Sequence, residues 1–294
     1  MLAYKRIGVT VKSGLDDKCQ TVDTIISILQ KEGADVFMDP KRVGGIECAT
    51  NLPEYKSEDD IDLLLVIGGD GTILRAVREL SDCSTPILSV NRGRVGFLAE
   101  IEFAEAAEVI PKLISGEGKI DERKLLSVCA MRGDEELLSG FALNEAVIAQ
   151  GTIARLVDLK TTVNDEPLTT FHADGLIIAT PTGSTAYNLS SGGPIVHPTL
   201  DAMILTPISP HSFTQKPVVI RSDARVEIKV LTKLSKYKDT DVVLTLDGQI
   251  YVRVQEDDRI TVTEDKRTVK FLRRERDTFF GTLREKLKWG ERVD

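Results

Sequence analysis

Three glycines around a single carboxylate form the part of this chain best suited to chemistry. The apolar run Leu63–Ile67 is followed by Gly68–Thr72, which reads Gly-Gly-Asp-Gly-Thr, and then by a helical pattern. An uninterrupted apolar run predicts a strand buried on both faces, as in a parallel sheet. The glycines let the backbone turn sharply and approach a ligand. Their N–H groups, with the positive end of the next helix, favour a phosphate.

The carboxylate of Asp70 in such a loop needs an explanation, because it repels the anion that the loop suits. Asp70 fits if it accepts a proton from a hydroxyl that attacks the phosphate, or if it helps to hold a bridging metal ion. The alternative is a tight turn between strand and helix in which Asp70 only caps the helix. The motif between a strand and a helix favours phosphoryl chemistry over this alternative.

A second candidate site follows the apolar segment Gly175–Ala179. The carboxylate of Asp174 precedes this segment, and the loop after it, Thr180–Asn188, is dense in hydroxyls and small residues. Small residues let a flat ring approach the backbone, and hydroxyls and amides then bind its polar edge. The alternative is a turn rich in Ser and Thr that caps a helix from Thr185. The density of glycines and hydroxyls favours a nucleoside pocket.

The composition indicates an ordinary globular protein of about two domains. The 294 residues are 41% hydrophobic and 29% charged. Lys and Arg number 38 against 46 Asp and Glu, a formal charge of −8, which argues against a nucleic-acid partner. No apolar stretch approaches the ~20 residues that cross a bilayer, and Met1–Arg6 lacks a signal-peptide pattern. We therefore expect a cytoplasmic protein with neither a nucleic-acid nor a membrane partner.

The cysteines and histidines predict no metal site. The four cysteines lie far apart in the sequence, which favours free thiols over a disulfide framework or zinc. The three histidines are also separated, which argues against a histidine-based metal site or a Ser-His-Asp hydrolase.

Residues 1–120 alternate between strand and helix patterns, which predicts a Rossmann-like α/β domain with a parallel sheet. Ligands of such sheets bind beyond the carboxyl ends of the strands, where the loops Gly68–Thr72 and Asn91–Phe97 fall. The expected strands are Arg6–Lys12, Ala34–Met38, Asp62–Ile67 and Pro86–Val90, and the expected helices include Thr21–Lys31 and Glu102–Ile114.

The rest of the chain has a different pattern. Short alternating runs from Ile120 to Phe271 predict a β-sandwich, and a helical pattern returns over Asp277–Trp289. A lone amphipathic helix is marginal, so we expect it to pack back on the first domain. The predicted organisation is an α/β nucleotide-binding domain of residues 1–120 joined by 273–294, and a β-sandwich domain of residues 121–272.

Taken in order, the motifs resemble those of the NAD kinase family, and the resemblance covers nearly the whole chain. The loop Gly68–Thr72 is shared with diacylglycerol and sphingosine kinases, whereas Asp174–Tyr187 is specific to NAD kinases. Such proteins pair an α/β domain with a β-sandwich, as both patterns predict. The matching segments are Gly68–Thr72, Asn91–Leu98, Asn144–Glu145, Asp174–Tyr187, Pro207–His211 and Asp247–Gln249.

The resemblance implies roles for individual residues. Asp70 would be the base that activates the 2′-hydroxyl of the adenosine ribose, and Asn144 with Glu145 would bind ribose hydroxyls, as an amide beside a carboxylate suits a diol. Glu145 stands where many members carry Asp. Arg75 is added because it follows the loop closely, although helix arginines are usually solvated. The residues expected to bind NAD or phosphate are Gly68, Gly69, Gly71, Thr72, Arg75, Phe97, Asn144, Glu145, Asp174, Thr182, Thr185, Ala186, Tyr187, Ser190 and Asp247.

The implied activity is transfer of a phosphoryl group from ATP, another nucleotide or polyphosphate to NAD, giving NADP. A divalent cation, Mg²⁺, is the expected cofactor, with no dedicated metal residues, and the expected assembly is a homodimer or homotetramer. One alternative is a lipid kinase with the same loop, which calls for an exposed apolar entrance that the sequence lacks. The other is a non-catalytic NAD(H) sensor, which would have no reason to retain Asp70.

Overall fold

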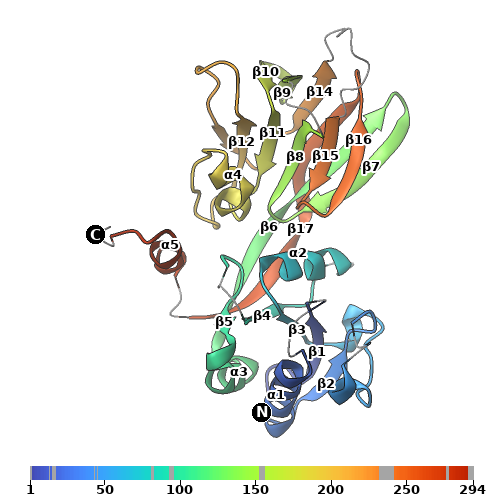
Figure 1. Cartoon of the computed structure of the whole chain (residues 1–294), viewed down its shortest axis with the longest axis vertical. Helices are drawn as coiled ribbons and strands as arrows, with labels where there is room; N and C mark the ends of the chain where they lie inside the picture. Colours follow the sequence, from blue (N-terminus) through green and yellow to red (C-terminus); the bar gives the residue numbers. More distant parts are fainter. Residues whose placement is uncertain are drawn as a thin grey trace. The chain divides into compact units, whose positions relative to one another are not determined.

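The computed structural model describes residues 2–12, 14, 18–42, 44, 46–80, 83–92, 96–151, 156–231, 242–275 and 278–290 (Figure 1). The chain divides into two compact units. Unit 1 comprises Met1–Glu122 with Val269–Asp294, and unit 2 comprises Arg123–Thr268. Residues 93–95 of the loop Asn91–Phe97 lie outside the described residues. The predicted fold class is confirmed: an α/β part with a mainly parallel sheet and a β-sandwich, with a helix near the end of the chain.

The sheet of unit 1 is parallel and buried. Its strand order is β17–β4–β3–β1–β2, and β5 also pairs with β4. All five residues of β3 are buried, as its uninterrupted apolar run predicts. Because β3 lies between β4 and β1, its carboxyl end carries the glycine loop to the middle of the sheet edge. The strands are β1 (Arg6–Val11), β2 (Asp35–Met38), β3 (Leu63–Ile67), β4 (Ile87–Asn91), β5 (Ile101–Glu102) and the end of β17 (Arg259–Arg274).

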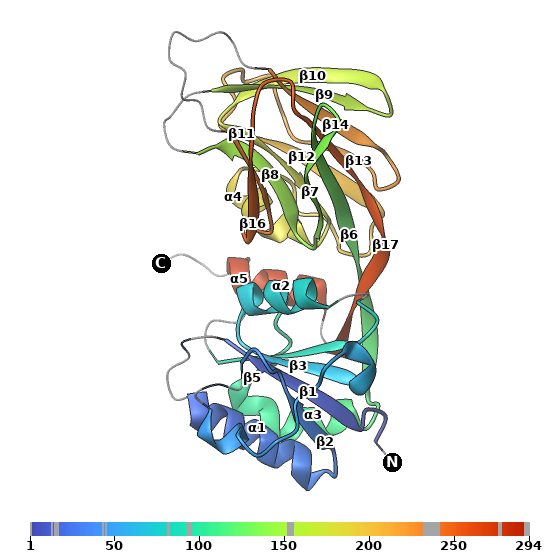
Figure 2. The same cartoon turned by 90° about the vertical axis from the view of Figure 1, so that its right-hand side faces the viewer.

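Helices cover both faces of this sheet. Helices α1 and α3 lie on one face and α2 on the other (Figure 2). Residues of α1 such as Ile25 and of α3 such as Ile110 share one buried core with the sheet residue Leu65. The helices are α1 (Lys18–Lys31), α2 (Asp70–Glu79), α3 (Ala106–Ile114) and α5 (Phe279–Leu287), with 3-10 turns η1 (Glu47–Ala49), η2 (Glu58–Asp60) and η3 (Phe103–Glu105).

The prediction of a helix from Glu102 is wrong at its start. Ile101 and Glu102 instead form β5, where Ile101 lies opposite Val90 of β4. A 3-10 turn follows, and the α-helix begins at Ala106. The apolar spacing of this segment suits a helix, but pairing with the sheet takes its first residues.

Unit 2 consists of two packed sheets. One contains β10–β9–β14–β17, with β6 paired to β17 and to β7, and the other contains β13–β12–β11–β8–β15–β16. Residues of both sheets, such as Phe171 and Ile178, form one buried core. The strands are β6 (Gly118–Arg132), β7 (Glu135–Ala142), β8 (Glu145–Gln150), β9 (Val157–Val163), β10 (Glu166–Ala173), β11 (Gly175–Ala179), β12 (Ala202–Ile208), β13 (Val218–Arg221), β14 (Val226–Leu231), β15 (Val242–Leu246) and β16 (Ile250–Val254).

The second sheet is buried on both faces at its centre. In β11, Ile178 belongs to the core between the sheets, whereas its neighbour Ile177 packs with Val196 on the opposite face. Side chains alternate between the faces of a strand, so a strand covered on both sides is apolar throughout. The covering segment contains η4 (Gly183–Thr185) and α4 (Tyr187–Ser190). The hydroxyl-rich loop therefore lies directly on the sheet.

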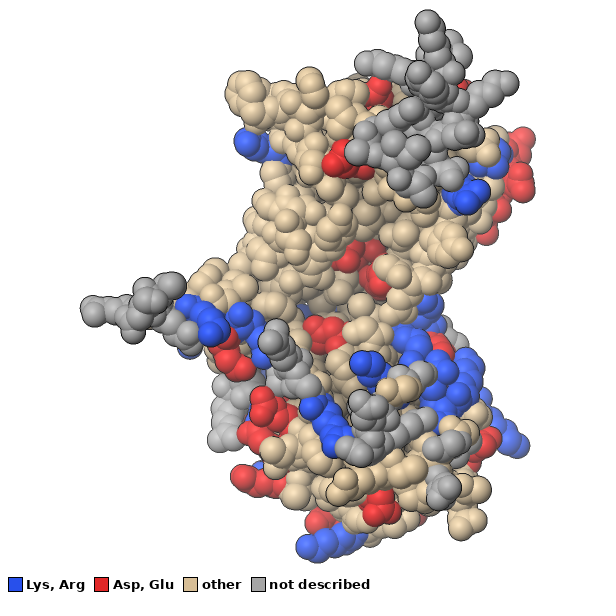
Figure 3. Space-filling view, viewed as in Figure 1, with Lys and Arg blue, Asp and Glu red and all other residues tan. Residues whose placement is uncertain are grey.

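Charged side chains are distributed unevenly over the surface. On the face in Figure 3, Lys, Arg, Asp and Glu crowd the part of unit 1 that is visible, whereas unit 2 is mostly uncharged.

Among the described helices, none combines the length and the hydropathy required to cross a membrane.

Candidate active site

Asp70 is held in one orientation by the backbone that follows β4. It begins α2 directly after Gly69, which occupies the N-cap position. Its carboxylate oxygens accept the N–H of Phe97 at 2.9 Å and the N–H of Leu98 at 3.2 Å. An ionised carboxylate has about four acceptor positions, so both oxygens retain the capacity to accept another hydrogen bond. The side chain is therefore fixed and still able to take a proton.

Two glycines around Asp70 are required by packing. A Cβ on Gly68 would overlap the side chain of Thr72, and a Cβ on Gly96 would overlap the Asp70 carboxylate. A Cβ on Gly69 or Gly71, in contrast, would meet no heavy atom within 4 Å. Within the glycine motif, Gly68 allows the tight turn, whereas Gly69 and Gly71 leave open space along the backbone.

In unit 2, Asp247 holds the three residues 143–145, which we call the strap. One of its carboxylate oxygens accepts the N–H of Asn144 at 2.8 Å and of Glu145 at 3.1 Å, and the other accepts the N–H of Leu143 at 2.9 Å. The backbone of Asp247 is left-handed, with φ of 51°. Asp residues are among the few that adopt this conformation readily. Asp247 therefore positions the two predicted ribose-binding residues by their backbone.

Glu145 is a buried acid with unused hydrogen-bonding capacity. The residue is 7% exposed, and its Oε2 atom is buried without a hydrogen-bond partner among the described residues. Burial, and then the negative charge of Asp247, raise the pKa of the Glu145 carboxyl to about 8. A buried polar atom without a partner carries an energetic penalty that a bound hydroxyl would remove.

The hydroxyl-rich loop is built on the strap. Thr180 donates its hydroxyl to the carbonyl of Leu143 at 2.6 Å, and its N–H to the carbonyl of Asn144 at 2.8 Å. A Cβ on Gly183 would overlap the Asn144 carbonyl, so the two backbones are in direct contact. Loop and strap are therefore joined by hydrogen bonds and direct backbone contact in unit 2.

Part of the loop's polar content is used for hydrogen bonds within unit 2. Ser184 hydrogen-bonds with Pro181 and Val196, and Asn188 binds the carbonyls of Ser184 and Pro194 and accepts the hydroxyl of Thr206. Both side chains are fully buried. These two side chains therefore serve the structure of the segment, and neither is among the predicted binding residues. The alternative of a turn that caps a helix from Thr185 is not borne out, because neither η4 nor α4 has a side-chain cap among the described residues.

Two family models match most of the chain. The model of the ATP-NAD kinase N-terminal domain matches residues 7–118, and that of the ATP-NAD kinase C-terminal domain matches residues 143–274. The chain belongs to the NAD kinase family. The resemblance seen in the motifs is confirmed.

Curated members of the family match almost end to end. The NAD kinase of Geotalea daltonii is 38% identical over 289 residues, which cover 98% of this chain and 100% of the relative. The NAD kinase of Citrifermentans bemidjiense is 42% identical over 292 residues, with the same two coverages.

Solved NAD kinase structures share the fold. Yeast NADH kinase complexed with NADH gives a TM-score of 0.86 at 26% identity, over 99% of this chain and 89% of the yeast chain. The NAD kinase of Archaeoglobus fulgidus in complex with ATP gives a TM-score of 0.73 at 27% identity, over 96% of this chain and 98% of that chain.

Several residues expected to bind ligand in this NAD kinase fold also have internal partners. Thr72 is buried and donates its N–H to Gly69 at 2.8 Å. Arg75 donates from Nη2 to the carbonyl of Val11 at 3.1 Å. Burial, and then the nearby Arg42 guanidinium, lower the pKa of Arg75. Binding of phosphate by Arg75 stays a prediction, but part of its guanidinium already binds the end of β1.

The predicted residues of the loop differ in exposure. Tyr187 is 44% exposed, Ser190 is exposed, and Ala186 and Thr185 are partly exposed, so these four remain accessible. Thr182 is buried instead, and its hydroxyl accepts the Arg123 guanidinium at 3.2 Å. Asp174 is partly exposed at the start of β11, where its backbone binds Ile208 and Gln150.

The site prediction missed Gly96, Leu98 and Arg123. Gly96 could have been found, because it is a glycine of the loop Asn91–Phe97, which follows a predicted strand at the same sheet edge. Leu98 contributes only a backbone N–H, which no residue type reveals. Arg123, a buried cation 59 residues from its partner Thr182, gives no local signal.

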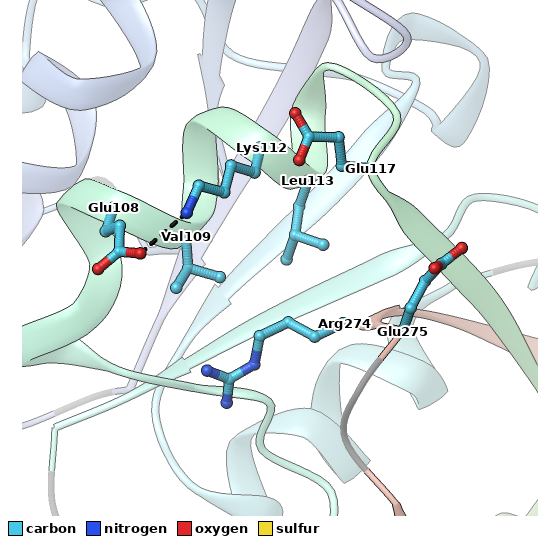
Figure 4. A pocket seen from close by; sticks show the side chains of 7 residues that line it. All are labelled: Glu108, Val109, Lys112, Leu113, Glu117, Arg274 and Glu275. Atoms are coloured by element: carbon cyan, nitrogen blue, oxygen red, sulfur yellow. Dashed lines mark hydrogen bonds and ion pairs between the residues drawn. The ribbon is translucent and has the colours of Figure 1, made fainter.

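A cavity in unit 1 lies apart from every predicted site residue. Its volume is about 450 Å³ (Figure 4). Arg274, on its wall, already binds Glu105 and the carbonyl of Glu100. Lys112 is likewise paired with Glu108 at 2.8 Å. None of the residues predicted to bind NAD or phosphate lines this cavity, and two of its charged residues are already paired. Its lining residues are Glu108, Val109, Lys112, Leu113, Glu117, Arg274 and Glu275.

Proposed function

We propose that this chain is an NAD kinase, a phosphotransferase that moves a phosphoryl group from ATP to the 2′-hydroxyl of the adenosine ribose of NAD and so gives NADP. Membership of the family supports this, as do the names of its full-length relatives. The two similar solved structures are complexes with NADH and with ATP. These ligands are a nicotinamide dinucleotide and a phosphoryl donor, the two classes of substrate in the proposed reaction.

The observation that carries the proposal is the fixed carboxylate of Asp70. Two backbone N–H groups orient it without exhausting its acceptor capacity, and it stands at the start of a helix after a glycine turn. In the reaction, Asp70 accepts the proton of the 2′-hydroxyl as that oxygen attacks the γ-phosphorus. The bond from this phosphorus to the bridging oxygen breaks, and ADP leaves. A positioned base of this kind accelerates a reaction by about 10²–10⁴-fold.

Glu145 and Asn144 supply the binding of ribose in this proposal. The Oε2 atom of Glu145, which has no hydrogen-bond partner among the described residues, forms a hydrogen bond with a ribose hydroxyl. The Asn144 amide binds the adjacent hydroxyl. The bonds of Asp247 fix the backbone of both residues before the ligand arrives. Tyr187, Ser190, Thr185, Ala186 and Asp174 are the accessible residues available to line the rest of the dinucleotide.

The residues present fit Mg²⁺ only with help from the substrate. Among the described residues there is no group of three or more His, Cys, Asp or Glu able to hold a metal. Mg²⁺ typically keeps waters and binds through one or two carboxylates plus substrate phosphates. Asp70, with acceptor capacity left on both oxygens, is the carboxylate best placed to contribute. When bound, Mg²⁺ neutralises charge on the transferred phosphoryl group.

The two rival functions are less well supported. A lipid kinase shares the glycine loop, but it does not account for the strap or for the hydroxyl-rich loop packed on it. A non-catalytic NAD(H) sensor accounts for the strap and not for a carboxylate oriented by two N–H groups beside open glycines.

One assay separates the three functions. The protein is incubated with NAD, ATP and Mg²⁺, and NADP is followed with an NADP-specific dehydrogenase. Formation of NADP supports the proposal. Binding of NAD without turnover indicates the sensor, and phosphorylation of diacylglycerol in place of NAD indicates the lipid kinase.

Replacing ATP by polyphosphate tests the donor, and light scattering tests the homodimer or homotetramer that the family resemblance implies.

A further inference from the structure

Two cysteines that are distant in the sequence lie together in unit 1. Cys19 is in the first turn of α1 and Cys48 is in η1. The Cys48 Sγ lies 3.4 Å from the backbone carbonyl oxygen of Cys19, to which it donates, although 29 residues separate the two. All four cysteines are present as thiols, as expected, but the sequence separation of Cys19 and Cys48 gave no sign of their proximity in the fold.

The core beneath the two cysteines keeps them close. Ile46 and Ala49, on either side of Cys48, are buried in the same core as Val22 of α1, three residues after Cys19. Helix α1 and η1 are in direct contact. Because both elements are anchored, the packing keeps the Cys48 side chain against the backbone of Cys19.

The pair is accessible, and its surroundings alter the pKa of Cys48. Cys19 and Cys48 are exposed, whereas Cys83 is buried and Cys129 is partly buried. Burial of the sulfur raises the pKa of the Cys48 thiol, and the charge of the neighbouring Cys19 thiol and of Asp23 raise it further. Because the thiolate is the attacking form, thiol exchange at Cys48 is slow at neutral pH and faster at mildly alkaline pH.

We infer that Cys19 and Cys48 form a reversible disulfide when the protein meets a low-molecular-weight disulfide such as oxidised glutathione. One cysteine thiolate attacks a sulfur of the oxidant, which releases one glutathione thiolate and leaves a mixed disulfide. The second cysteine then attacks the protein sulfur of that mixed disulfide and releases the second glutathione. The protein loses two protons and two electrons, and the oxidant gains both and is reduced to two thiols.

The bond would join the beginning of α1 to the segment after β2. It closes a loop of 29 residues, and a cross-link of this length stabilises a protein mainly by restricting the unfolded chain. Oxidation is therefore expected to raise the midpoint of thermal unfolding, and reduction with dithiothreitol to restore it. The inference does not depend on the proposed kinase activity.

The experiment treats the full chain with oxidised glutathione at mildly alkaline pH and maps its peptides by mass spectrometry under non-reducing conditions. We expect two of the four thiols to be lost to a thiol reagent, and one linked pair of peptides carrying Cys19 and Cys48. Cys19→Ser and Cys48→Ser should each acquire one glutathione on the remaining cysteine instead. Cys129→Ser, the matched control, should still form the link.

Three results would overturn the inference. One is a wild-type protein that keeps both thiols free. Another is a protein that carries a separate glutathione on each of the two cysteines, and the third is a link that involves Cys83 or Cys129. Circular dichroism of each variant checks that it folds. If a Ser variant is unfolded, the thermal shift of the oxidised wild type, reversed by dithiothreitol, gives the same test.

Discussion

The carboxylate of Asp247 accepts the backbone N–H of Asn144 at 2.8 Å, across 103 residues of sequence. The same carboxylate holds Leu143 and Glu145, so one side chain positions the whole strap. Asp247 was predicted to bind the dinucleotide. Its bonds support a different role, in which it prepares the residues that bind.

Replacing Asp247 tests this role. Asp247→Asn keeps the shape but turns one acceptor oxygen into a donor facing backbone N–H groups. We expect the KM for NAD to rise by about tenfold or more while kcat falls less, and the free energy of unfolding to drop by about 1–3 kcal/mol. The control Asp223→Asn changes an exposed Asp that pairs with Arg221, and it should alter both quantities by little. A fall in kcat alone would point to a direct part in the reaction.

Substitution of two glycines in unit 1 is expected to have two different effects on turnover and binding. Gly96→Ala forces the Asp70 carboxylate to move, and a displacement of about 1 Å in a reacting group costs up to about 10²-fold in turnover. Gly69→Ala places its Cβ in open space, so the protein should remain as stable as the wild type. Its methyl group would nevertheless obstruct a ligand that approaches the backbone, which raises the KM for the nucleotide.

Steady-state kinetics and thermal unfolding of these variants check both outcomes. Gly44→Ala is the matched control, because its Cβ would also meet no heavy atom within 4 Å and it lies outside the predicted motifs. Equal turnover of Gly96→Ala and the wild type would remove the link between Gly96 and the orientation of Asp70.

The buried acid of Glu145 makes stability depend on pH. Its folded-state pKa of about 8 exceeds the ordinary value of 4.5, so between these values the folded protein binds the proton and the unfolded chain does not. The contribution of Glu145 to the free energy of unfolding is therefore complete below pH 4.5. It decreases as the pH rises toward 8, by at most about 1.4 kcal/mol per pH unit. Glu145→Gln imitates the neutral acid and should not lose it.

Urea unfolding of both proteins from pH 5 to pH 9 measures this difference. The wild type should lose stability relative to Glu145→Gln as the pH rises. Parallel curves would mean that Glu145 is already ionised in the folded protein, and that its Oε2 has solvent or another partner.

Removal of the Glu145 side chain should affect the binding of NAD more than the rate of the chemical step. Glu145→Ala deletes the group proposed to bind a ribose hydroxyl, so we expect the KM for NAD to rise by about tenfold or more and kcat to change less. Glu135→Ala, an exposed position on β7, is the control. A fall in kcat with unchanged KM would assign Glu145 to the reacting step instead.

Local patterns were sufficient for the parts of the fold that depend on neighbours in sequence. The apolar run of β3, the glycines after it and the periodicity of α2 predicted the strand, the turn and the helix that carry Asp70. The apolar segment Gly175–Ala179 predicted the strand β11 ahead of the hydroxyl-rich loop, although not that this strand is covered on both faces.

Bonds between distant residues could not be predicted in this way. Asp247 and the strap are about a hundred residues apart, and the partner of Asp70 is a backbone N–H, which no residue type reports. Pairing of Ile101 with Val90 overrode a helical pattern for the same reason. Cys19 and Cys48 meet only because α1 and η1 share a core.

The central claim is that Asp70 takes the proton of the attacking hydroxyl, and Asp70→Asn tests it most directly. Turnover is measured as NADP formed from NAD, ATP and Mg²⁺, and NAD binding is measured separately by calorimetry, with the exposed Asp134→Asn as control. Asn retains one acceptor oxygen for the backbone but is a far weaker base. We predict turnover reduced by about 10²–10⁴-fold with NAD binding nearly unchanged. Turnover equal to that of the wild type would contradict the account.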